Sequence, residues 1–137
     1  WGSSEITTVS PGNLICKEVD GITIDYLVEK YQINDCGFVK IDIEGGESFI
    51  IESMKNFFDI QQPILYISLH PHLMNNNQLE NTISSIFDIY PYIYNINYDL
   101  LEKNKSIEMF FKKKIEIEHD LLPSNVGHEL IGTFKKL

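Results

Sequence analysis

The stretch Ile64–Leu69, which reads ILYISL, is a nearly continuous apolar run between Pro63 and the pair His70-Pro71. Alternating apolar and polar residues are typical of a strand with one solvated face, whereas an uninterrupted run is typical of a strand buried on both faces. Strands of the second kind occur mainly in α/β proteins, where helices cover the sheet. The run therefore predicts an α/β fold with a buried strand at this position.

The segments around this run alternate between the helical and the strand period. Apolar residues at helical spacing predict helices that begin after Thr23 as N-cap, at Glu47 and near Leu79. The residues of Phe38–Ile43 and Tyr92–Ile96 instead indicate strands. Strands that alternate with helices in this way indicate a parallel sheet covered on both sides by helices.

The two ends of the chain are less regular. Residues 1–20 have the composition of a loop, with one short strand over Leu14–Val19. Near the C-terminus, Ile107–Lys113 is ambiguous, Ile115–Glu118 alternates like a strand, and Glu129–Phe134 predicts a final strand. The length of 137 residues fits one domain.

The charge balance excludes some classes of partner. The chain has 11 Lys and Arg residues against 20 Asp and Glu residues, a formal net charge of −9, which opposes binding to nucleic acid or to an anionic membrane. No apolar run approaches the roughly 18 residues of a membrane span, and no signal peptide is recognised, so we expect a cytoplasmic protein. Cys16 and Cys36 lack metal-ligand spacing, and we expect reduced thiols at both positions.

Polar side chains follow two predicted strands at the edge where open α/β sheets bind ligands. Asp42 and Glu44 follow the first strand, and His70 follows the second. Because residues two apart on a strand share a face, Lys40, Asp42 and Glu44 are expected to point the same way. Two structural alternatives stay open: Asp42 could simply pair with Lys40, and Glu47 could be an ordinary acid in the first turn of a helix.

The chain lacks the patterns of several standard sites. It contains no glycine-rich phosphate loop and no Gly-x-Ser-x-Gly nucleophile elbow. His70 and His72 could be half a metal site, but no third ligand stands at a standard spacing, so we expect no metal centre. A neutral His70 that acts as a base or hydrogen-bond partner fits better. A metal-dependent hydrolase with Asp42, Glu44 and His70 as ligands is an alternative.

Three stretches within residues 22–72 can be matched to known motifs: ITIDYLVEKY, GFVKIDIEGGE and PILYISLHPH. Together they resemble the FkbM family of S-adenosylmethionine-dependent methyltransferases, whose members have a T-[LI]-D-x-L helix, a K-[IV]-D-[IV]-E-G-x-E strand end and a strand that closes on His-Pro. The middle motif is specific, and the other two support it. The resemblance implies a class I, Rossmann-like methyltransferase sheet that is mostly parallel with an antiparallel last strand.

The same resemblance implies an activity and a site. It implies S-adenosylmethionine as methyl donor and a small-molecule acceptor, a sugar or polyketide-like compound, that is methylated on a hydroxyl. The residues that would carry catalysis are Asp42, His70 and Glu44. The residues that would border the cofactor are Lys40, Asp42, Glu44 and Gly45.

The likeness to this family is incomplete. The glycine-rich loop and the ribose-binding acid that follow the first two strands of such folds have no counterpart, and Ser68 stands where many relatives have glutamate. We therefore expect residues 1–137 to be a single domain that forms the C-terminal portion of a methyltransferase domain, with a sheet incomplete at its N-terminal half. The alternative is a noncatalytic fragment or degenerate methyltransferase-like binding domain, whose open sheet edge would favour a homodimer.

Overall fold

The computed structural model describes residues 21–119, 121 and 128–137. The strand predicted over Leu14–Val19 and the thiol of Cys16 lie outside these residues. The chain separates into two compact units, residues 1–33 and residues 34–137. In the described ranges, no helix has both the length and the apolar character needed to cross a membrane.

The described part of the first unit contains one helix, α1 (Ile24–Tyr31). Its N-terminus forms as predicted, because the Thr23 side chain accepts a hydrogen bond from the backbone N–H of Tyr26 at 3.2 Å. The helix ends at Gln32, whose φ of 52° is left-handed.

The second unit is an α/β structure built on a four-stranded sheet with the order β1-β2-β4-β3. Its strands are β1 (Phe38–Ile41), β2 (Ile64–Leu69), β3 (Tyr92–Tyr94) and β4 (His128–Thr133). The pairing of β1 with β2 is parallel, and both pairings of β4 are antiparallel. The prediction of an antiparallel last strand is therefore confirmed. The first three strands share one direction, but β4 lies between β2 and β3, so only one of the three pairings is parallel.

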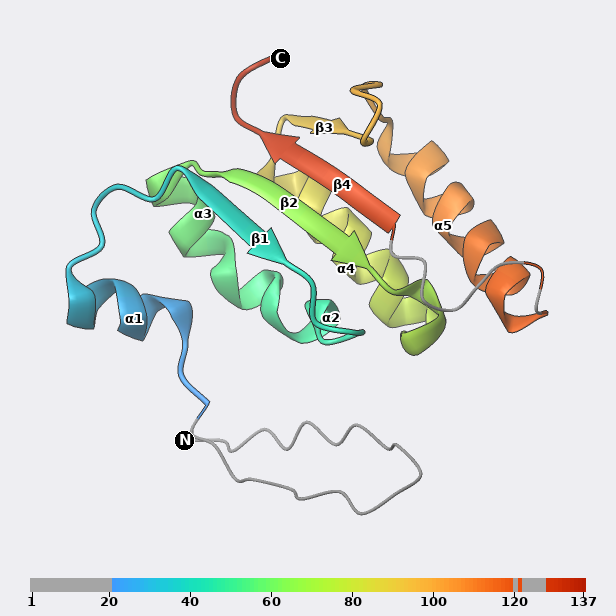
Figure 1. Cartoon of the computed structure of the whole chain (residues 1–137), viewed down its shortest axis with the longest axis horizontal. Coiled ribbons are helices and arrows are strands. Elements are labelled where there is room, and N and C mark those ends of the chain that lie inside the picture. The colour runs from blue at the N-terminus through green and yellow to red at the C-terminus, as the bar shows by residue number, and fades with distance from the viewer. Residues whose placement is uncertain (1–20, 120, 122–127) are drawn as a thin grey trace. The chain divides into compact units, whose positions relative to one another are not determined.

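The connections between these strands are helical. They contain α2 (Glu47–Ile50), η1 (Glu52–Met54), α3 (Lys55–Gln61), η2 (Pro71–Leu73), α4 (Asn76–Ile89) and α5 (Lys103–Glu118). The helix predicted to begin at Glu47 is thus interrupted by a 3-10 turn. In Figure 1, α2, α3 and α4 lie behind the strands.

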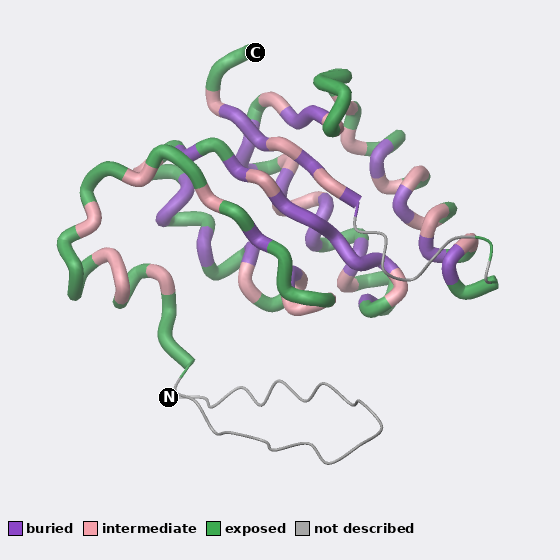
Figure 2. Tube along the Cα trace, in the orientation of Figure 1, coloured by how far each residue is buried: buried purple, intermediate pink, exposed green. Residues whose placement is uncertain are grey.

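The core of the second unit lies between this helical layer and one face of the sheet. Leu65, Ile67 and Leu69 of β2 are fully buried on that face, together with Leu130 of β4. On the opposite face, Ile64 is 43% exposed and Tyr66 is half-buried. Figure 2 shows the same contrast along the strands. The prediction that β2 is buried on both faces therefore holds for its C-terminal part, where Ser68 is also buried.

The strand predicted over Ile115–Glu118 is wrong, because these residues form the end of α5. Ser106, Phe110, Lys114 and Ile117 are the buried residues of this helix, and they recur at helical spacing. Ile115 is 54% exposed, so the apparent alternation of apolar residues does not reflect a shared buried face. Lys114 holds α5 in place, since its ammonium group donates hydrogen bonds to the Met74 carbonyl and the Asn76 side chain.

Candidate functional site

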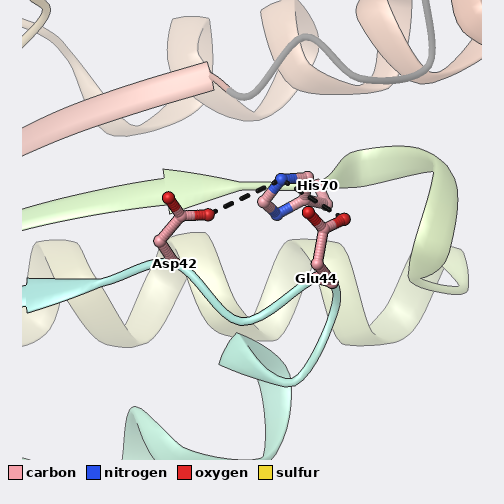
Figure 3. A group of neighbouring side chains, drawn as sticks. All are labelled: Asp42, Glu44 and His70. Carbon is pink, nitrogen blue, oxygen red and sulfur yellow. Dashed lines mark ion pairs between the residues drawn. The ribbon is translucent and has the colours of Figure 1, made fainter. Parts of the chain in front are cut away.

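The ends of β1 and β2 bring the predicted site residues together. The two strands are parallel and in register, with Ile41 beside Ile67, so their carboxyl ends lie at the same edge of the sheet. Asp42 and Glu44 follow β1, and His70 follows β2 (Figure 3). One ligand atom from each of these three side chains lies within 4.8 Å of the others. This juxtaposition agrees with the prediction from strand order.

The turn after β1 differs from the predicted continuation of the strand to Ile43. β1 ends at Ile41, and the backbone then enters the left-handed region at Glu44, with φ 53°, and at Gly45, with φ 92°. Glu44 therefore reaches the site through a turn and not through strand alternation with Lys40 and Asp42. A Cβ atom at Gly45 would lie 2.8 Å from the Cβ of Leu73, so this position requires glycine for both φ and space.

The side chain of Glu47 stabilises this turn through hydrogen bonds to its backbone. Its side chain is fully buried, and its carboxylate accepts hydrogen bonds from the backbone N–H of Ile43 at 3.0 Å and of Gly45 at 2.9 Å. The residue is the first of α2, as an ordinary helix acid would be, but its contacts serve the site. In the sequence, only the position of Glu47 in the strand-end motif GFVKIDIEGGE indicated a role at the site.

His70 connects Glu47 to the two exposed carboxylates. Its side chain is only 5% exposed, and its Nδ1 lies 3.3 Å from Oε1 of Glu47. Because a carboxylate is an acceptor, this contact favours a proton on Nδ1. The other ring nitrogen, Nε2, lies 3.9 Å from Oδ1 of Asp42 and 3.7 Å from Oε2 of Glu44.

Lys40 lies at the outer side of the same cluster. Its ammonium group is 3.0 Å from Oδ2 of Asp42, and the two side chains are 56% and 39% exposed. The ion pair between Asp42 and Lys40 that was left open as an alternative is therefore formed. Asp42 also lies near His70. An exposed pair of this kind contributes little to stability.

Two further histidines lie near this edge. His128, at the start of β4, pairs with Leu69, and burial followed by the charge of Lys113 lowers the pKa of His128 to about 4. Lys113 donates a hydrogen bond to His128 Nδ1 at 2.9 Å. Burial and then His70 lower the pKa of His72. His128 could not be placed here from the sequence, because only the pairing of β4 brings it near β2.

One of the comparisons with known proteins identifies a family for this chain. The model of the family described as the methyltransferase FkbM domain matches residues 2–113. No curated protein and no solved structure matches the chain. The family match covers well over half of the 137 residues, and it includes the strand-end motif and the His-Pro that form the cluster above. The chain therefore belongs to the FkbM family of methyltransferases.

Proposed function

We propose that this protein transfers a methyl group from S-adenosylmethionine to a hydroxyl of a small molecule, of the sugar or polyketide-like class. Family membership supports methyl transfer in general. The observation that carries the finer proposal is the position of His70 Nε2, which faces two exposed carboxylates at the carboxyl edge of parallel strands. This is the edge at which α/β sheets bind ligands.

The described residues fit one part of S-adenosylmethionine. Its methionine end carries a sulfonium and an ammonium group, and both match the negative charge of Asp42 and Glu44, whose side chains are 39% and 69% exposed. Lys40 borders the same space through its pair with Asp42. The N–H of Gly45 is already bonded to Glu47, so we propose that Gly45 borders the cofactor by close backbone approach. We assign no described residue to the adenosine.

When bound, the cofactor supplies an electrophilic methyl group, and the residues of the chain align the acceptor and accept its proton. In this proposal the acceptor hydroxyl lies near His70, whose Nε2 takes the proton while Glu47 retains the proton on Nδ1. Asp42 is the alternative base. Glu44 orients the acceptor, and alignment of the attacking oxygen with the methyl group provides most of the acceleration.

The first test is a calorimetric titration of the 137-residue chain with S-adenosylmethionine and with its demethylated product, in the presence of EDTA. We expect binding of both in the micromolar range, on the order of 1–100 μM. A chain that binds neither would be the noncatalytic, degenerate domain that is the alternative reading.

The second test measures methyl transfer to a panel of hydroxylated sugars and polyketide-like compounds. Asp42→Asn and His70→Ala should each lower turnover by about tenfold or more, because each removes a proposed base. Asp59→Asn and His119→Ala are matched controls at exposed positions, and they should leave turnover unchanged. Circular dichroism checks the folding of each variant. Wild-type turnover in both site variants would contradict the proposed roles.

A further inference from the structure

Three side chains at the strand ends form a set that is chemically suited to a cation. Asp42, Glu44 and His70 offer two carboxylate oxygens and one imidazole nitrogen within 4.8 Å of one another. They come from two segments of the chain, as Figure 3 shows. His70 is almost fully buried, whereas both carboxylates are accessible from solvent.

Hydrogen bonding between these side chains does not explain their arrangement. Charge-assisted N–H···O bonds are about 2.7–2.9 Å long, whereas Nε2 lies 3.9 Å from Asp42 and 3.7 Å from Glu44. Nε2 of the almost fully buried His70 therefore faces both carboxylates across a gap that is too wide for a hydrogen bond. A small cation that bound all three donor atoms would occupy this gap and neutralise the two carboxylates.

Glu47 supplies a second, independent observation that points to the same ligand. Histidines that bind a metal usually donate their other ring N–H to a carboxylate, which fixes the tautomer and the ring orientation. Nδ1 of His70 is 3.3 Å from the buried carboxylate of Glu47, and two backbone N–H groups hold that carboxylate in place. The residue that would hold the ring of a metal-binding histidine is therefore present.

We propose that Asp42, Glu44 and His70 bind one divalent cation of the class that accepts both nitrogen and oxygen ligands, such as Mn²⁺. An imidazole ligand disfavours Mg²⁺ and Ca²⁺, and two carboxylates disfavour softer ions. Metal–ligand bonds of about 2.0–2.2 Å require the three donor atoms to come somewhat closer together. The exposed carboxylate of Glu44 can move toward the cation while buried His70 remains fixed.

The role of this cation rests on the proposed function. Three protein ligands leave coordination positions for an acceptor hydroxyl and for a neighbouring oxygen, as in a vicinal diol or a hydroxy-carbonyl group. The O–H bond then breaks with its proton passing to water, and the oxygen forms a bond to the methyl carbon. The methyl–sulfur bond breaks, and its electron pair stays on sulfur. With the cation bound, His70 is one of its ligands and water takes its place as the proton acceptor, whereas without the cation His70 keeps the role of base proposed above.

The test is a titration of the 137-residue chain with Mn²⁺, followed by electron paramagnetic resonance, without S-adenosylmethionine or acceptor. We expect one bound Mn²⁺ per chain. Glu44→Gln and Asp42→Asn should each weaken binding by about 10–100-fold. Glu80→Gln, which removes the same charge from an exposed position on α4, should leave the affinity unchanged. Equal affinity in all four proteins would overturn the proposal.

A second measurement asks whether the imidazole participates. Diamagnetic Zn²⁺ should shift the Nε2 resonance of His70 in nitrogen-15 spectra and leave that of exposed His119 in place. Mg²⁺ that binds as tightly as Mn²⁺, with no change at His70, would reveal only a nonspecific acidic cluster and would overturn the proposal.

The cation proposal and the methyl-transfer proposal can be tested independently of each other. Cation binding is measured without cofactor, and cofactor binding is measured in EDTA. Loss of methyl transfer in EDTA, with retained S-adenosylmethionine binding, would support the cation and exclude His70 as a sufficient base. Full transfer in EDTA would remove the proposed role of the cation and leave methyl transfer intact.

Discussion

At the scale of single residues, Glu47 holds the site together. It joins the turn after β1 to the histidine after β2 through two backbone N–H groups and one ring nitrogen. Its fully buried carboxylate has hydrogen-bond partners, which makes the burial of a charge tolerable. The sequence indicated the motif that contains this residue, but the three contacts require the folded turn.

We predict that Glu47→Gln destabilises the protein. The amide NH₂ that replaces one carboxylate oxygen would face a backbone N–H or the ring nitrogen, and an unpaired buried donor costs about 1–3 kcal/mol. Urea denaturation measures the free energy of unfolding. Glu52→Gln, at an exposed position of η1, is the control and should have the wild-type value. Equal stability of both variants would show that the carboxylate is not needed.

His128 provides a prediction of pH dependence. Its pKa of about 4 in the folded protein lies below the ordinary histidine value of 6.5, so the unfolded chain binds a proton more readily between these pH values. Stability therefore falls as the pH is lowered from 6.5 to 4, by an amount on the order of 2–3 kcal/mol.

Denaturation curves at several pH values test this dependence. His128→Gln should flatten the profile in the window between pH 4 and 6.5. His119→Gln, at an exposed position, should retain the wild-type slope. If the slope were unchanged in His128→Gln, another group would cause the pH dependence.

At the scale of elements, β4 depends on close contact with Tyr90, the residue that follows the end of α4. Tyr90 is buried, and its hydroxyl donates a hydrogen bond to the Pro63 carbonyl at 3.1 Å. The backbone of Gly132 lies against the ring of Tyr90. The glycine is therefore required by packing between two segments that are distant in sequence.

We predict that Gly132→Ala destabilises the sheet. The new Cβ would lie 2.8 Å from Cγ of the Tyr90 ring, which is held on its other sides by Phe58 and Phe134. Overpacking of this kind costs about 1–3 kcal/mol. Gly37→Ala is the matched control, because no atom lies within 4 Å of the position of its Cβ. A wild-type melting temperature for Gly132→Ala would mean that the ring moves aside without cost.

At the scale of the whole molecule, the described sheet has an open edge at β1. Within the described residues β1 pairs only with β2, and the adjacent Phe38 and Ile64 are 59% and 43% exposed. An edge with exposed apolar side chains is a surface for pairing with another chain. The homodimer expected from the sequence stays a prediction.

We predict that the 137-residue chain self-associates with increasing concentration. Phe38→Lys should shift it toward the monomer in sedimentation experiments, because an edge lysine opposes strand pairing. Phe49→Lys, at a position that is 74% exposed on α2, should associate as the wild type does. A monomer at every concentration would contradict this use of the edge.

The sequence alone determined the alternation of strands and helices, because the apolar period of each segment follows from its own backbone geometry. It also determined the motif that places Asp42, Glu44 and His70 after two strands. The strand prediction at Ile115–Glu118 was wrong because it relied on the alternation of only two isoleucines. The buried residues of α5 form a longer stripe at helical spacing.

Only the tertiary structure decided what lies beside these residues. The left-handed turn at Glu44, the contact between Glu47 and His70, and the approach of His128 to β2 all join segments through pairing or packing. The chemistry of the site depends on distances of a few ångströms between segments far apart in the chain. Local periodicity does not specify such distances, because they are set when the parallel strands and β4 assemble into one sheet.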